Sequence, residues 1–258
     1  MSDPILLRDD AAGVCTLTLN RPQARNALSR PLMAALQEAL DVVAADASIK
    51  VVVLAANGPA FCAGHDLKEV RGLSQQEHLP LFEQCSRLMT TIVHLPKPVI
   101  AKVHAMATAA GCQLVASCDL AYAAQEARFA TPGVNIGLFC STPMVALSRA
   151  VGRKKAMEML LSGRPISAAE AEAAGLINHA VAAADLDAVV ADIAGTIASK
   201  SPLTLAIGKE AFYRQVEMPL EDAYAYASEV MARNMAARDA AEGIDAFIEK
   251  RPPVWQGC

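Results

Sequence analysis

The sequence predicts an α/β fold that ends in a purely helical segment. Short apolar strands alternate with amphipathic helices as far as residue 181, a pattern typical of helices packed on a sheet. From Asp185 onward only helix signals remain. The chain has 258 residues and is 53% hydrophobic but only 4% aromatic, so mainly aliphatic side chains must form its core. We expect one large unit, with a core of residues 1–195 and a C-terminal helical segment of residues 196–258.

Apolar runs predict the strands. Val14 to Leu19 alternates between two faces, which indicates a strand with one buried side. Val51 to Ala55 and Val99 to Val103 are almost unbroken apolar runs, as expected in a sheet covered on both faces. Shorter strands are expected at Leu120–Ala123, Arg128–Ala130 and Leu176–Val181.

Capping residues predict where the earlier helices begin. Ser29, with Pro31 in the first turn, starts a helix whose apolar stripe runs from Leu32 to Val43. Ser74-x-x-Glu77 is a capping box that opens a second helix. The apolar positions of that helix fall on one face, so we interpret them as core: Leu81, Cys85, Leu88, Ile92 and Leu95.

The later helices carry similar signals. Ser141 is expected to cap a helix that has Pro143 in its first turn. Ser167-x-x-Glu170 is a second capping box, and Gly175 is suited to end the helix that follows it. Helices are further expected at 154–161, 186–199, 203–215, 220–235 and 240–250.

A glycine-bearing turn at Asn57 to Leu67 joins a predicted strand to a helix. Gly64 allows a tight turn and a close approach of the backbone to a ligand. Asp66 is suited to cap the helix that follows. In this geometry the backbone N–H of His65 is free to face a cleft.

A second stretch, His104 to Gln113, is also suited to direct free backbone N–H groups into a cleft. It passes through very small residues into an apolar helix that ends near Cys118. The start of that helix would present a second set of unpaired N–H groups. Two such donors from separate turns, aimed at one oxygen, form an oxyanion hole.

These two stretches resemble the two signatures of the crotonase (enoyl-CoA hydratase/isomerase) superfamily, at Phe61 to Leu67 and Ala105 to Asp119. Further motifs follow in the family's order: Asn20-Arg21-Pro22, Asn26-Ala27-Leu28, Ala150-Val151-Gly152, residues 166–171, Gly175-Leu176-Ile177 and residues 247–251. The resemblance implies a spiral of repeated ββα units. It also implies a homotrimer or a dimer of trimers.

The resemblance implies that the chain binds acyl-CoA thioesters. The thioester oxygen would lie on the backbone N–H groups of His65 and Ala110, which could contribute about 3–4 kcal/mol each to an enolate. Ala110 replaces the family's usual glycine and fits if its backbone keeps a negative φ. The acyl chain would lie against the 70–80 and 135–145 regions. Coenzyme A would be part of the substrate rather than a permanently bound cofactor, with these residues near it: Gln23, Ala24, Arg25, Ala63, His65, Asp66, Leu67 and, at a neighbouring subunit's nucleotide, Lys250.

The hydratase branch holds a water between two glutamates, and the matching positions here are Gln113 and Gly133. Neither side chain can carry a proton, and each acid or base typically contributes ~10²–10⁴-fold, so we expect poor hydration. Three alternatives remain open. The chain is an enzyme with another reaction (a hydrolase, isomerase or decarboxylase), a non-catalytic acyl-CoA-binding protein, or a hydratase that uses another carboxylate such as Glu83.

Two other side chains are candidates for chemistry. Cys140, near a predicted helix N-terminus, could be an activated thiol or simply an apolar filler. The His65 imidazole could titrate near neutral pH or only line the pocket.

Composition argues against several classes of partner. The net charge is −4 and no basic run is present, so nucleic acid is not an expected partner. The seven cysteines show no metal-ligand spacing, so we expect reduced thiols, no metal and a cytoplasmic protein. Residues 129–148 carry no charge, but Pro132 and Pro143 argue against a membrane span. Met1 to Pro4 lacks the pattern of a secretory signal.

Overall fold

The computed structural model describes residues 3–258. Of the segment Met1 to Pro4, in which no secretory signal was expected, the first two residues lie outside the described range. Two sheets form the body. The larger has the order β1-β2-β3-β5-β7-β10, and it is parallel except for β1 and β2. Its strands are Leu6–Ala11, Val14–Leu19, Val51–Ala56, Val99–Val103, Leu120–Ala124 and His179–Val181.

A smaller sheet has the order β4-β6-β8-β9, and only β8 and β9 run antiparallel. Its strands are Ala60–Cys62, Met106–Thr108, Arg128–Ala130 and Ile166–Ser167. Each of β3, β5 and β7 is followed by a strand of the smaller sheet and then by helices. This repeated order is the expected ββα arrangement, and the α/β class is confirmed.

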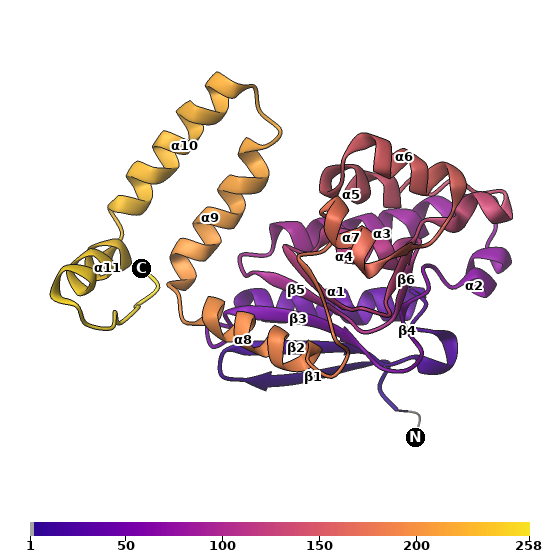
Figure 1. Ribbon diagram of the computed structural model, residues 1–258, viewed down its shortest axis with the longest axis horizontal. Coiled ribbons are helices and arrows are strands. Elements are labelled where there is room, and N and C mark those ends of the chain that lie inside the picture. Colours follow the sequence, from indigo (N-terminus) through magenta and orange to yellow (C-terminus); the bar gives the residue numbers. More distant parts are fainter. Residues whose placement is uncertain (1–2) are drawn as a thin grey trace.

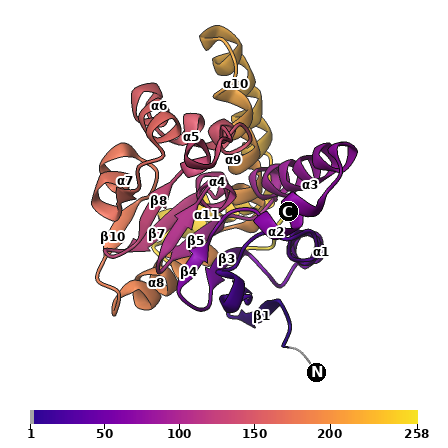
Figure 2. The ribbon, with the colours of Figure 1, turned by 90° about the vertical axis from the view of Figure 1, so that its right-hand side faces the viewer.

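The larger sheet is covered on both faces. Val52 and Leu54 of β3 belong to the main core with α1 (Arg30–Ala45) and α3 (Gln75–His94). Val51 and Val53 instead pack with α8 (Leu186–Ala198) on the other side of the sheet. Figure 2 shows α8 across the sheet from α3. The prediction from the unbroken apolar run is therefore confirmed.

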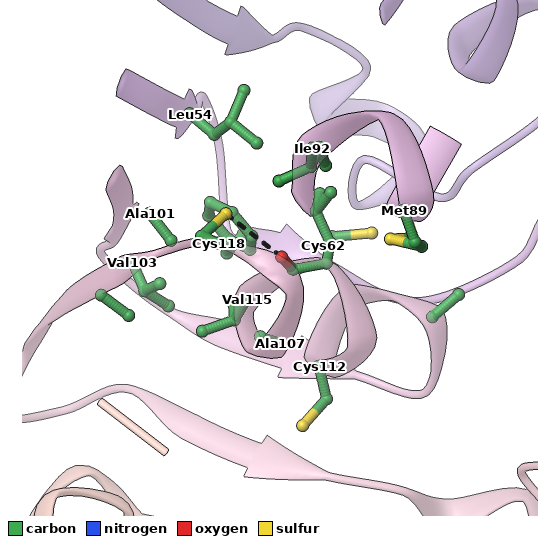
Figure 3. Packing of buried hydrophobic residues seen from close by; sticks show 14 of the residues in the cluster. Leu54, Cys62, Met89, Ile92, Ala101, Val103, Ala107, Cys112, Val115 and Cys118 are labelled. Carbon is green, nitrogen blue, oxygen red and sulfur yellow. Dashed lines mark hydrogen bonds between the residues drawn. The ribbon is translucent and has the colours of Figure 1, made fainter. Parts of the chain in front are cut away.

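The centre of the main core lies around α4 (Ala110–Ser117). Figure 3 shows Val115 and Cys118 close to Cys62 of β4 and to the helix that carries Met89 and Ile92. The Cys118 thiol donates a hydrogen bond to the Leu114 carbonyl at 3.2 Å. Six of the seven cysteines are buried, and all seven are unpaired.

Most predicted caps are confirmed. The Glu77 carboxylate accepts a hydrogen bond from the Ser74 N–H at 2.9 Å before α3, and Ser167 and Glu170 cap each other before α7 (Ala168–Ala174). The cap expected at Ser141 is wrong, because α5 (Pro143–Ala150) begins after Thr142. Both the N–H and the hydroxyl of Ser141 donate to the Phe139 carbonyl, which keeps Ser141 in the preceding turn.

Three differences from the predicted elements have local causes. The last strand of the larger sheet begins at His179 rather than Leu176, because the Leu176 N–H donates to Ala171 O and completes the end of α7. The three-residue strands β4 and β6 were expected to be turn. They are too short for an alternating pattern, and they are defined by the pairing of β4 with β6 and of β6 with β8.

The remaining helices are α2 (Leu67–Gly72), α6 (Arg153–Ser162), α9 (Pro202–Gln215), α10 (Leu220–Met235) and α11 (Arg238–Glu249). Figure 1 shows α10 and α11 projecting from the body at the end opposite to α2. The expected boundary at residue 195 falls inside α8. Lys209 anchors α9 to the sheet through an ion pair with Asp119 at 2.7 Å. Within residues 3–258, no helix has both the length and the apolar content needed to cross a membrane.

Candidate active site

Two turns that are far apart in the sequence meet at the centre of the site. A Cβ on Gly64 would lie 2.9 Å from the Ala109 Cβ and 3.4 Å from the Ala110 nitrogen, and Gly64 has a φ of +90°. A Cβ on Gly111 would lie 2.2 Å from the Cys62 carbonyl oxygen. Only glycine fits at both positions, so the turn after β4 can press directly against the start of α4.

The backbone N–H groups of His65 and Ala110 lie at this contact. Throughout the described part of the chain, neither group donates a hydrogen bond, although the Ala109 N–H donates to Ala130 O at 2.9 Å. Ala110 is the first residue of α4 and keeps a negative φ, so the alanine fits there. Ala109 has a φ of 50° and a ψ of −118°, a strained conformation that typically costs roughly 1–3 kcal/mol.

A cavity of about 470 Å³ opens beside these N–H groups. Its wall is mainly apolar and comes from the turn after β4, from α3 and from the segment before α5. The main lining residues are Ala63, His65, Leu67, Val70, Phe82, Ala109, Ala110, Pro132, Gly133, Asn135, Ile136, Leu138, Phe139, Cys140, Ser141, Thr142 and Pro143. Within residues 3–258, no carboxylate lines this cavity.

The two positions expected to match the hydratase glutamates, Gln113 and Gly133, differ in their surroundings. Gln113 is 4% exposed, lies one turn beyond Ala110 on α4, and leaves its Oε1 without a hydrogen-bond partner. Gly133 lines the cavity, and a Cβ there would lie 2.6 Å from Leu138 O and 2.9 Å from the Cys140 Sγ. The loop before α5 therefore takes the space that a side chain at position 133 would need. Glu83 does not line the cavity.

The two titratable groups of the cavity both favour their neutral forms. Burial lowers the pKa of His65, and a contact with the Leu28 backbone opposes this shift less strongly. Among residues 3–258, neither ring nitrogen meets the geometry of a hydrogen bond. The ring stands edge-on to Phe82 at 5.4 Å. Burial raises the pKa of the Cys140 thiol, which is the opposite of the activation expected at a helix N-terminus. Cys140 lies before α5 begins and fills apolar space beside Gly133.

The structure brings together most of the residues expected near coenzyme A. Gln23 and Ala24 lie in a short 3₁₀ turn, and the Ala63 N–H donates to Arg25 O at 3.0 Å, beside the cavity. The Arg25 side chain is exposed.

Two further residues of that set, Asp66 and Lys250, do not line the cavity. Asp66 caps α2 and forms an ion pair with Arg21 at 3.1 Å. Lys250 ends α11, far from β4 in this chain (Figure 1). Of the regions expected to line the acyl pocket, 135–145 does so, whereas 70–80 contributes Val70. Phe82 was missed, because the stripe on its helix indicated only core.

Known proteins match this chain over nearly its whole length. The family model described as enoyl-CoA hydratase/isomerase matches residues 9–258. The enoyl-CoA hydratase domain-containing protein 3, mitochondrial, of Xenopus laevis is 48% identical over 98% of this chain and 86% of its own length. The human protein of that name is 48% identical over 94% of this chain and 80% of its own length.

Solved structures agree. An enoyl-CoA hydratase of Mycobacterium smegmatis superposes with a TM-score of 0.96 at 55% identity, and covers 98% of this chain and 99% of its own. The human enoyl coenzyme A hydratase domain-containing protein 3 superposes with a TM-score of 0.95 at 46% identity, and covers 98% of this chain and all of its own. The chain therefore belongs to the enoyl-CoA hydratase/isomerase family.

Proposed function

We propose that the chain binds acyl-CoA thioesters, accepts the thioester oxygen on the N–H groups of His65 and Ala110, and stabilises the enolate formed at the α-carbon. The observation that carries this proposal is the pair of unbonded N–H groups at the contact of two turns, beside an apolar cavity. Each such donor typically contributes about 2.7–4 kcal/mol, or about 10²–10³-fold in rate.

We further propose that the chain hydrates enoyl-CoA substrates only inefficiently. A water attacking an enoyl-CoA needs a group that removes its proton, and in the described chain no cavity carboxylate can do so. The neutral His65 imidazole is the remaining base, and we assign it to the α-proton rather than to water. This assignment favours isomerase-type proton transfer over hydration.

A non-catalytic acyl-CoA-binding protein is the second candidate. It is favoured by Gln113 and Gly133 at the positions of the hydratase glutamates, and by the raised pKa of Cys140. In this case the same cavity would hold the thioester without proton transfer.

We propose that coenzyme A, as part of the substrate, lies along the exposed edge of the site, where the exposed Arg25 guanidinium can bind one of its phosphates. The helical segment 196–258 is proposed to form a homotrimer or a dimer of trimers. Phe247 and Ile248 on α11 are 86% and 71% exposed and offer an apolar surface for a neighbouring subunit. The unpaired thiols are compatible with a reducing compartment such as the cytoplasm.

Exchange of α-hydrogens tests the two candidates directly. The protein is incubated with butanoyl-CoA in D₂O, and deuterium at the α-carbon is followed by mass spectrometry beside a protein-free control. We expect exchange well above the control, and no hydration of crotonyl-CoA above it. Binding without exchange would favour the non-catalytic candidate, whereas rapid hydration would refute the argument from the missing carboxylates.

A further inference from the structure

The direction of the His65 N–H is fixed by a neighbouring segment, residues 25–28, which we name the strap. The Leu28 N–H donates to Gly64 O at 2.7 Å, and the Asp66 N–H donates to Leu28 O at 3.3 Å, so Leu28 and His65 form a parallel β-bridge. In a trans peptide the C=O and the N–H point in opposite directions. Because the strap holds the Gly64 C=O, the His65 N–H must point the other way, towards the start of α4.

The strap has a conformation that needs support. Arg25 and Asn26 both have positive φ, at 49° and 52°, and such consecutive residues are rare unless glycine is present. Asparagine tolerates this region better than most side chains, but a free strap would leave it readily. The shape of the strap therefore depends on its contacts.

Asn26 supplies those contacts from the inside. It is fully buried, and its Oδ1 accepts from the Arg21 N–H at 2.8 Å. Its Nδ2 donates to Asn57 O at 2.7 Å and to Ala60 O at 2.8 Å. One side chain thus ties the strap to the loop that leads into β4, and β4 leads directly to Gly64.

Arg21 closes the strap from the outer side. Its Nη1 donates to Ala27 O at 2.6 Å, and its Nη2 donates to the Asp66 carboxylate at 3.1 Å. The guanidinium therefore holds the strap and the residue after His65 at a fixed separation. Arg21 lies outside the cavity wall and makes no contact that would bring it to the thioester.

We infer that Asn26 and Arg21 are positioning residues that aim the His65 N–H at the thioester oxygen. This inference rests on the proposed function, and it names the side chains that hold one of the two N–H donors in place. It explains why an asparagine with positive φ and a half-buried arginine stand beside a site that neither of them enters.

The carbonyl stretching frequency of bound butanoyl-CoA, labelled with ¹³C at the thioester carbon, reports how strongly the oxygen is polarised. In the wild-type protein the frequency should fall relative to free butanoyl-CoA. In Arg21→Gln the decrease in carbonyl frequency on binding should be less than half of the wild-type decrease. The α-exchange rate should fall about tenfold, which corresponds to about 1.4 kcal/mol of barrier. Asn26→Asp, which replaces the amide donor with oxygen, should have effects at least as large.

The control is Arg164→Gln, which removes an exposed arginine that is paired with two carboxylates away from the site. It should leave the frequency at the wild-type value. If thermal unfolding shows that Arg21→Gln is folded, and bound butanoyl-CoA shows the full wild-type decrease in carbonyl frequency, the inference is overturned. This holds even if Asn26→Asp does not fold. If the wild-type protein shows no fall, the oxyanion proposal itself fails, and the inference fails with it.

Discussion

Gly64→Ala is the substitution that most directly disturbs the contact between the two turns. The new Cβ would lie 2.9 Å from the Ala109 Cβ and 3.1 Å from Thr108 O, at a φ of +90°. Holding an L-residue in a left-handed conformation costs roughly 1–2 kcal/mol, and overpacking typically costs about 1–3 kcal/mol. We therefore expect the free energy of unfolding to fall by about 2–5 kcal/mol.

The same substitution should also slow the chemistry at temperatures where the variant remains folded. Moving Gly64 away from Ala109 also moves the His65 N–H, which should cost one oxyanion donor, or about 10²–10³-fold in α-exchange. Urea unfolding and the exchange assay measure the two effects separately. Gly195→Ala in α8 is the control, because its Cβ would meet open space and should stabilise the helix by about 0.5–1 kcal/mol. A folded Gly64→Ala protein with wild-type exchange would refute the reasoning.

The same structure gives four further predictions, two of them for His65→Gln. His65→Gln keeps the backbone donor but removes the proposed base, so acyl-CoA binding should persist while α-exchange falls by about 10²-fold or more. Burial lowers the pKa of His65 below its usual 6.5, so below about pH 6.5 the unfolded chain binds more protons at this residue than the folded chain does. Its contribution to stability is therefore complete above that pH and is lost as the pH falls, and urea unfolding of His65→Gln should lack this part of the pH slope. Gly133→Glu combined with Gln113→Glu should not create a hydratase, because the new Cβ at position 133 would lie 2.6 Å from Leu138 O; hydration of crotonyl-CoA by the folded double variant would contradict this. Lys209→Met should lower the free energy of unfolding by about 3–5 kcal/mol because it leaves Asp119 without its buried cation, whereas Lys155→Met, which breaks an exposed pair, should change it far less.

Local signals in the sequence were sufficient for the elements with a long or strongly patterned run. The unbroken apolar residues of β3 predicted a strand buried on both faces, and the packing of Val51 and Val52 on opposite sides bears this out. The capping boxes at Ser74 and Ser167 placed the starts of α3 and α7. These signals depend on residues within a few positions of one another.

The details of the site depend on contacts that are remote in the sequence. Gly64 and Asp66 indicated a tight turn, but the close contact of Gly111 with Cys62 is a tertiary feature. The same holds for the loop before α5, whose Leu138 carbonyl blocks the space beside Gly133. Phe82 reaches the cavity from a position on α3 that lies beside the apolar stripe assigned to the core and is not part of it. The sequence therefore indicated which two turns are suited to face a cleft and gave less information about the wall of the cavity beside them.

We propose that two backbone N–H groups hold the thioester oxygen, and a crystal structure of the protein with butanoyl-CoA would show whether they do. We expect the oxygen to lie about 2.7–3.1 Å from both the His65 and the Ala110 nitrogens, with the acyl chain in the apolar cavity. A bound thioester whose oxygen is directed away from these two nitrogens would rule out this role for them.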